Sequence, residues 1–165
     1  MATPNLILNE RQILHKIKRI AYQIYENNST EEKITLAGIA SKGYQLAEKL
    51  REHLQEISPL KIILCKIEID KENPLLPIKT SLKKEAYTNT SVILVDDVLN
   101  SGSTLIYSAK HFLEVPLKKL QTAVLVDRSH KKYPVKADFK GISLSTSLNE
   151  TVKVSFEKET KVVLV

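Results

Sequence analysis

The chain has 165 residues, 42% hydrophobic and 27% charged, a composition typical of one globular domain with a sizeable core. It has no apolar run near the ~20 residues of a membrane span and no basic-then-apolar leader, so we expect neither a membrane protein nor a secreted one. A single cysteine, Cys65, excludes an intrachain disulfide and indicates a reducing cytoplasm. The net charge of +6 favours phosphorylated ligands or nucleic acid as partners, without deciding between them.

Helical and extended patterns alternate along the chain. An amphipathic helix is predicted over residues 6–28, with Asn9 as its N-cap and a stripe of isoleucines on one face. A strand over 33–40 leads into a second helix over 44–57, and a third helix runs from about 105 to 114. Further strands are expected at 60–69, 92–95, 120–126, 139–142, 151–156 and 161–164. This alternation predicts a single α/β domain over residues 1–165, built on a parallel sheet with right-handed crossovers.

Residues 70–90 show neither period. They contain Pro74 and Pro77, which argue against a central strand, and the basic pair Lys83 and Lys84. A long irregular segment inside a compact domain is often a lid or another functional loop. We therefore expect a flexible lid at about 70–90.

One stretch combines a buried strand with a chemical pattern. Aliphatic residues at 92–95 lead into Asp96 and Asp97, and helical spacing begins at Leu105. Between them lies a small polar loop made of Asn100, Ser101, Gly102, Ser103 and Thr104. Ligands of open α/β sheets bind beyond the carboxyl ends of the strands, and free N–H groups at a helix start suit a phosphate. The loop is therefore predicted to bind a phosphate, with Gly102 allowing a close backbone approach.

The two carboxylates need a different partner, because they repel a phosphate. Asp96 and Asp97 can accept hydrogen bonds from sugar hydroxyls, or hold Mg²⁺ directly or through water. A ligand with a phosphate, a diol and a metal ion satisfies both halves of the motif. The simpler alternative is an ordinary turn with solvated acids and helix-capping hydroxyls.

Two more strand ends carry polar residues. Ser41, Lys42 and Gly43 follow the strand over 33–40, where a second phosphate site and a plain turn are almost equally well supported. The basic loop 129–134 follows the strand over 120–126, and it is either a solvated turn or a contact for a ligand or RNA. The candidate RNA contacts in this loop and beside it are Arg128, His130, Lys131, Lys132 and Lys136.

Residues 92–104 resemble the signature of type I phosphoribosyltransferases for 5-phosphoribosyl 1-pyrophosphate (PRPP): four hydrophobic residues, two acids, two hydrophobic residues and a short Ser/Thr-Gly loop. Residues 125–139 and 145–150 are similar to the matching stretches of the pyrimidine operon attenuator/uracil phosphoribosyltransferase (PyrR) family. The resemblance implies a Rossmann-like parallel twisted sheet flanked by helices, with a small hood. It also implies transfer of phosphoribose from Mg²⁺-bound PRPP to a nucleobase such as uracil, releasing pyrophosphate, and at least a homodimer.

The resemblance also assigns roles by position. Asp96 and Asp97 would hold the ribose hydroxyls and the metal, residues 100–104 the 5-phosphate, and residues 41–43 the pyrophosphate. The base is expected near Val126, Asp127 and the loop 145–150.

The chain departs from this family where positive charge is expected. Ser103 and Lys42 stand where arginines are usual, and the shortened lid lacks an Arg-Asp pair, for which Lys79, Lys83 and Lys84 offer replacement charge. Three functions remain open: an active transferase, an RNA-binding regulator that uses the pocket as a nucleotide sensor, and a PRPP-binding relative with little turnover.

Overall fold

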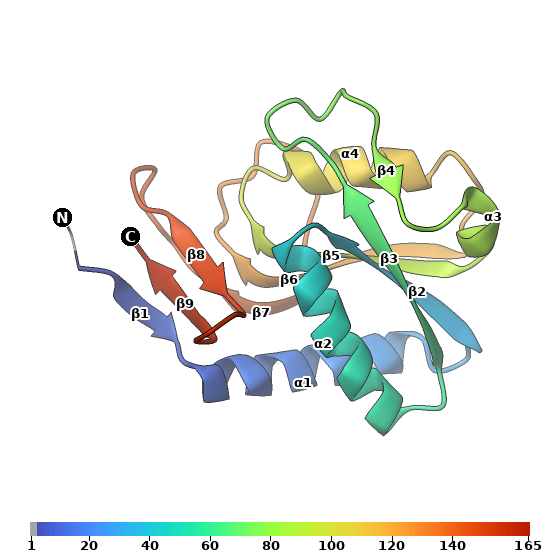
Figure 1. The fold of residues 1–165 in the computed structure, drawn as a ribbon, viewed down its shortest axis with the longest axis horizontal. Helices are drawn as coiled ribbons and strands as arrows, with labels where there is room; N and C mark the ends of the chain where they lie inside the picture. Colours follow the sequence, from blue (N-terminus) through green and yellow to red (C-terminus); the bar gives the residue numbers. More distant parts are fainter. Residues whose placement is uncertain (1–2) are drawn as a thin grey trace.

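A six-stranded sheet forms the centre of the fold in the computed structural model, which describes residues 3–165 (Figure 1). In spatial order its strands are β4 (Lys79–Thr80), β3 (Lys61–Glu68), β2 (Lys33–Ile39), β5 (Ser91–Leu99), β6 (Lys119–Asp127) and β7 (Phe139–Ser143). All neighbours are parallel except β4, which pairs antiparallel with β3. The predicted parallel α/β architecture is therefore confirmed.

The strand order reverses direction at the middle of the sheet. From β2 the chain crosses to β3 on one side, whereas from β5 it crosses to β6 and β7 on the other. The segments that leave the carboxyl ends of β2 and β5 therefore diverge and open a crevice between them. Such a switch point is where open α/β sheets bind ligands.

Helices cover both faces of the sheet. They are α1 (Glu10–Asn27) and α2 (Lys42–Ile57) on one face, and α3 (Lys84–Tyr87) and α4 (Ser103–Phe112) on the other (Figure 1). Alternate residues of β5 divide between the two faces, because Ile93 packs with α1 and α2 while Leu94 packs with α3 and α4. β5 is buried along all nine residues, which explains why its first half contains the unbroken aliphatic run at 92–95.

The start of α1 confirms one sequence prediction and corrects another. Asn9 caps the helix: its Oδ1 accepts the Gln12 N–H at 2.9 Å, and the Gln12 side chain accepts the Asn9 N–H at 2.9 Å. Residues 6–8, however, are not helical but belong to β1 (Asn5–Leu8). Their partner strand lies more than 150 residues along the chain, so no local pattern could reveal the pairing.

A small second sheet forms a hood beside the main one (Figure 1). In it β1 pairs with β9 (Lys161–Leu164), which pairs with β8 (Val152–Ser155), all antiparallel. Val152, Val154 and Val162 are buried against the core formed with α1 and α2. The hood therefore takes a defined place over the end of the sheet where β5 and β6 finish.

The segment between β3 and β5 is only partly irregular. It contains β4 and α3, and Tyr87 is fully buried with its ring 4.6 Å from that of Phe112. The first part is exposed: the Asp70 carboxylate accepts backbone N–H bonds that turn the chain, and Leu75 is 75% exposed. The second half is thus built into the fold, and the lid role stays a prediction for the first half.

In the described part of the chain, no helix has both the length and the apolar character needed to cross a membrane. Cys65 is fully buried in β3. Burial raises the pKa of this thiol, which keeps it protonated and unreactive.

Candidate active site

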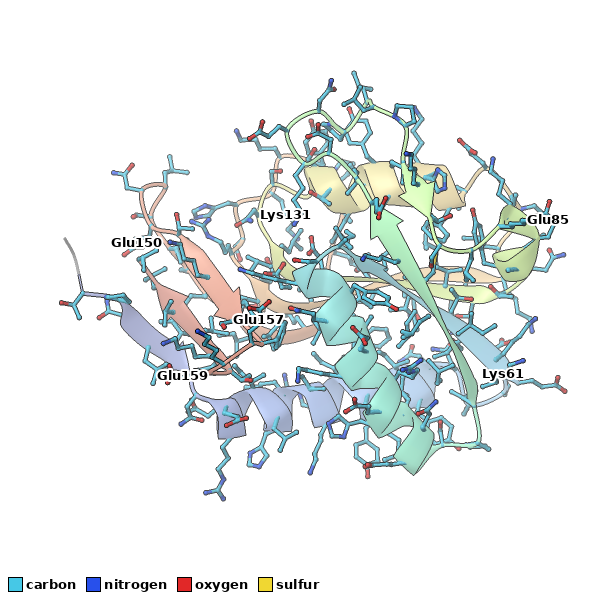
Figure 2. All side chains as sticks on the ribbon, viewed as in Figure 1. Lys61, Glu85, Lys131, Glu150, Glu157 and Glu159 are labelled. Carbon is cyan, nitrogen blue, oxygen red and sulfur yellow. The ribbon has the colours of Figure 1, made fainter. Side chains whose placement is uncertain are left out.

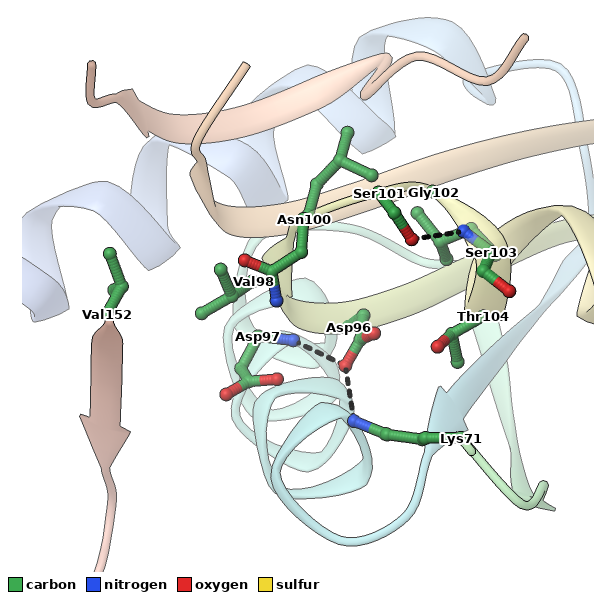
Figure 3. A pocket seen from close by; sticks show the side chains of 12 residues that line it. Lys71, Asp96, Asp97, Val98, Asn100, Ser101, Gly102, Ser103, Thr104 and Val152 are labelled. Carbon is green, nitrogen blue, oxygen red and sulfur yellow. Dashed lines mark hydrogen bonds and ion pairs between the residues drawn. The ribbon is translucent and has the colours of Figure 1, made fainter. Parts of the chain in front are cut away.

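A cavity of about 160 Å³ opens at the switch point of the sheet (Figure 3). It is lined by Lys71, Asp96, Asp97, Val98, Leu99, Asn100, Ser101, Gly102, Ser103, Thr104, Leu105 and Val152. The acidic pair and the polar loop predicted from the sequence therefore face one space. Val152 shows that the hood also contributes a wall.

The polar loop is shaped as an anion site. Gly102 has φ +88°, a left-handed conformation that favours glycine, and a Cβ there would lie 2.4 Å from Val135 Cγ1. No side chain caps the start of α4; the hydroxyl of Ser101 instead accepts the Ser103 N–H at 3.2 Å within the loop. The other first-turn N–H groups of this ten-residue helix, together with the side chains of Ser103 and Thr104, remain available to a ligand.

The acidic pair is held in an environment that opposes its charge. Asp96 is 4% exposed and Asp97 is 9% exposed. Burial first, and the neighbouring Asp97 second, raise the pKa of Asp96 well above its usual value, while Lys71 acts in the opposite direction. Asp96 Oδ1 also accepts the Asp97 N–H at 2.9 Å. Two desolvated carboxylates with so few donors are suited to receive hydroxyl groups or a cation.

Sequence reasoning missed the cation nearest to this pair. Lys71 Nζ lies 3.9 Å from Asp96 Oδ1, and Figure 3 shows the side chain reaching the acidic pair from the start of the irregular segment. Lys84, one of the expected replacements for the lid arginine, instead pairs with Glu114. The available signal was position: Lys71 follows β3, whose carboxyl end lies at the same edge of the sheet as the motif.

The turn after β2 reaches the acidic pair through one residue. A Cβ on Gly43 would lie 2.6 Å from the carbonyl oxygen of Val95 and 3.2 Å from Asp96 Oδ1, so only glycine permits this approach. Ser41 and Lys42 are exposed and line a neighbouring cavity of about 350 Å³ between α2 and the hood. The structure thus places Gly43 against Asp96, which lines the first cavity, and Ser41 and Lys42 in the neighbouring cavity.

The two residues expected near the base, Val126 and Asp127, lie outside the cavity of the acidic pair. The Val126 side chain is buried in the core, and Asp127 is 5% exposed, with its carboxylate accepting the Ser129 N–H at 2.9 Å. Neither residue lines the cavity of the acidic pair. A contact with a base from this region would therefore come from backbone groups or after a movement of the loop 145–150 before β8, here called the hood loop.

The structure corrects the sequence interpretation of the basic loop. Arg128 is buried, and its guanidinium donates to Asn100, Thr146, Ser147 and Glu150, so it is not available to RNA. His130 is half-buried, with Nε2 2.7 Å from the Thr146 carbonyl oxygen. The three remaining residues, Lys131, Lys132 and Lys136, are exposed as an RNA contact requires.

The residues present fit a Mg²⁺ ion only if a bound substrate also supplies oxygen ligands to it. No group of three or more His, Cys, Asp or Glu side chains able to hold a metal comes together within residues 3–165. Mg²⁺ often binds through one or two carboxylates together with substrate oxygens and water. Asp96 and Asp97 match that donor set, because they form an isolated carboxylate pair beside an anion-binding loop.

Comparison with known proteins agrees with this geometry. Residues 5–158 match the family model described as "Phosphoribosyl transferase domain". The chain is 37% identical over 157 residues to a "Bifunctional protein PyrR" of Fusobacterium nucleatum, covering 90% of this chain and 89% of that one. The chain therefore belongs to the phosphoribosyltransferase family, and PyrR proteins are among its relatives.

Solved structures show the same fold at lower identity. The hypoxanthine phosphoribosyltransferase of Trypanosoma cruzi superposes with a TM-score of 0.80 at 16% identity, covering 97% of this chain and 95% of that one. A hypoxanthine-guanine phosphoribosyltransferase of Bacillus anthracis gives a TM-score of 0.74 at 22% identity, covering 88% and 85%.

Gly102→Ala tests the shape of the anion loop. The new methyl group meets Val135 and imposes strain at positive φ, so we expect a loss of about 2–4 kcal/mol of unfolding free energy. Urea denaturation measures this loss. A variant as stable as the wild type would show that the loop does not have this conformation in solution.

Asp96→Asn tests the electrostatic cost of the acidic pair. Because the pKa of Asp96 is raised in the folded state, its ionisation destabilises the fold as the pH rises through that value. We expect the variant to have a higher Tm than the wild type at pH 7. The difference should vanish below about pH 4, where Asp96 is protonated in both the folded and unfolded states. A variant less stable than the wild type at pH 7 would contradict this account.

Proposed function

We propose that the protein transfers 5-phosphoribose from Mg²⁺-bound PRPP to a nitrogen of a nucleobase and releases pyrophosphate. The observation that carries this proposal is that an uncapped helix start and a buried carboxylate pair face one cavity at the switch point. Membership of the phosphoribosyltransferase family supports the same reaction class. Uracil is the first base to test, because the sequence resembles the uracil phosphoribosyltransferases of the PyrR family.

Each part of the cavity has a role in this proposal. Residues 100–104 bind the 5-phosphate through backbone N–H groups and hydroxyls. Asp96 and Asp97 accept the ribose hydroxyls and share the metal with the substrate, and when bound the metal neutralises charge on the pyrophosphate. Residues 41–43 approach the leaving pyrophosphate at the start of α2, where Ser41 makes no side-chain cap.

The chemistry requires positioning rather than a protein nucleophile. The bond from ribose C1′ to the pyrophosphate oxygen breaks, the bond from C1′ to the base nitrogen forms, and that nitrogen gives up its proton. Positive charge develops on the ribose ring in the transition state, close to the carboxylates that hold its hydroxyls. The protein supplies orientation, charge complementarity and exclusion of water.

Lys71 adds a mobile cation to this arrangement. Its side chain is about half exposed and sits 3.9 Å from Asp96, so the ion pair is a weak one. When ribose hydroxyls and metal engage Asp96, the Lys71 ammonium is released to meet pyrophosphate oxygens. We propose that it partly replaces the lid arginine usual in the family.

The assay follows pyrophosphate release from PRPP and Mg²⁺ with a panel of bases. We expect product with at least one base, and a loss of at least about 100-fold in kcat/KM for Asp97→Asn, because the negative charge beside the ribose ring and the metal is lost. Lys71→Gln should raise the KM for PRPP, whereas Lys61→Gln, an exposed control at the opposite end of β3, should not. Absence of product with every base would rule out turnover, and PRPP binding measured by calorimetry without product would favour the inactive relative.

A second function, RNA binding regulated by the nucleotide site, is favoured by the anchoring of the basic loop. The backbone N–H groups of Lys132 and Tyr133 both donate to the Ser101 carbonyl oxygen, at 2.8 and 3.2 Å. The exposed lysines are therefore tied to the anion loop itself, so a bound phosphate can influence their placement. We also propose a cytoplasmic homodimer or larger assembly as the working form of either function.

Replacing Lys131 and Lys132 with Glu tests this surface. We expect RNA retention to fall steeply and the salt dependence of the remaining binding to flatten, because phosphate contacts are lost. The matched control replaces Lys61 and its β2 neighbour Lys33 with Glu, since Lys61 lies at the far end of the sheet from Lys131 (Figure 2). Equal retention by the double variant and the control would exclude the surface.

A further inference from the structure

Arg128 is a buried cation without a counter-charge. Its residue is 9% exposed, and no carboxylate of residues 3–165 lies within ion-pairing distance of its guanidinium. Its partners are neutral oxygens: Thr146 Oγ1 at 3.0 Å, Asn100 Oδ1 at 3.0 Å, and the carbonyl oxygens of Ser147 at 3.3 Å and Glu150 at 2.6 Å. Burying a charge in this way costs free energy of folding, and an anion that comes close reduces that cost.

The bond to Asn100 determines which way that amide faces. A guanidinium has only donors, so Asn100 must present its carbonyl oxygen to Arg128. The amide nitrogen is then turned the other way, and Figure 3 shows it pointing into the cavity on the side of Asp97. No described residue accepts a hydrogen bond from this nitrogen, although Asn100 lines the cavity.

The polarity of this pair suits an anion. Hydrogen bonding to a cation withdraws charge from the Asn100 carbonyl and makes the amide N–H groups stronger donors. The guanidinium contacts Asn100, the first residue of the loop that has Ser103 where an arginine is usual in the family. A positive charge is therefore present beside the anion loop, but it is buried and contacts the loop through Asn100.

We propose that Arg128 is a positioning residue that orients and polarises Asn100, so that the Asn100 amide donates to the phosphate of the bound ligand. The pair takes the place of the arginine missing at position 103. This inference rests on the proposed function, because it needs a phosphorylated ligand in the cavity. The same guanidinium also holds Thr146, Ser147 and Glu150 of the hood loop, so its effect on binding must be separated from support of the fold.

Asn100→Asp separates the two roles. An aspartate at position 100 can accept the Arg128 bond as a full ion pair, so we expect a Tm equal to or above that of the wild type. The variant has no amide donors and adds a negative charge, so its affinity for ribose 5-phosphate should fall about 10- to 100-fold. Asn27→Asp makes the same charge change at the exposed end of α1 and should bind like the wild type.

Isothermal titration with ribose 5-phosphate and a thermal melt of each variant decide the matter. An Asn100→Asp variant that binds within twofold of the wild type overturns the inference. So does a parallel loss of affinity and of several degrees in Tm, because the pair would then only support the fold. A wild-type protein that binds neither PRPP nor ribose 5-phosphate counts against the proposed function instead.

Discussion

The candidate site depends on two charged features that lie close together at the end of β5: a negative pair of carboxylates and the positive N-terminus of α4. β5 carries two buried carboxylates that line the crevice, and the chain then turns, through Gly102, into a helix whose positive end is left uncapped. The carboxylate pair and the helix start each cost free energy of folding, because desolvated acids and unsatisfied N–H groups both lack partners. A ligand with hydroxyls or a cation at one end and an anion at the other satisfies both, which explains why this crevice is the candidate site.

The centre of the fold could be predicted because its signals are local. The aliphatic run of β5, the acids after it and the spacing of α4 are all contiguous, and Asn9 caps α1 through a residue three positions away. The hood was harder, since β1 is four residues long and its partner strand is near the other end of the chain. Short strands stabilised by distant partners leave almost no periodic signal.

The sequence was enough to predict which residues line the site, but not which distant residues they contact. Lys71 reaches Asp96 only because β3 lies two strands from β5, and the motif itself carries no trace of that neighbour. Arg128 looked like part of a basic surface, yet the hood loop folds over it and removes it from water. Charge and spacing identify candidate residues, whereas burial, which depends on the tertiary fold, decides what each can do.

The exposed stretch after Asp70 has one further consequence. Its two ends are fixed, by the Asp70 turn on one side and by the pairing of β4 with β3 on the other. Closing a loop between fixed ends costs free energy that grows only logarithmically with its length, about 0.6 kcal/mol for each doubling. Relatives can therefore lengthen or shorten this segment, and with it the reach of its cations, while the sheet beneath keeps nearly the same stability.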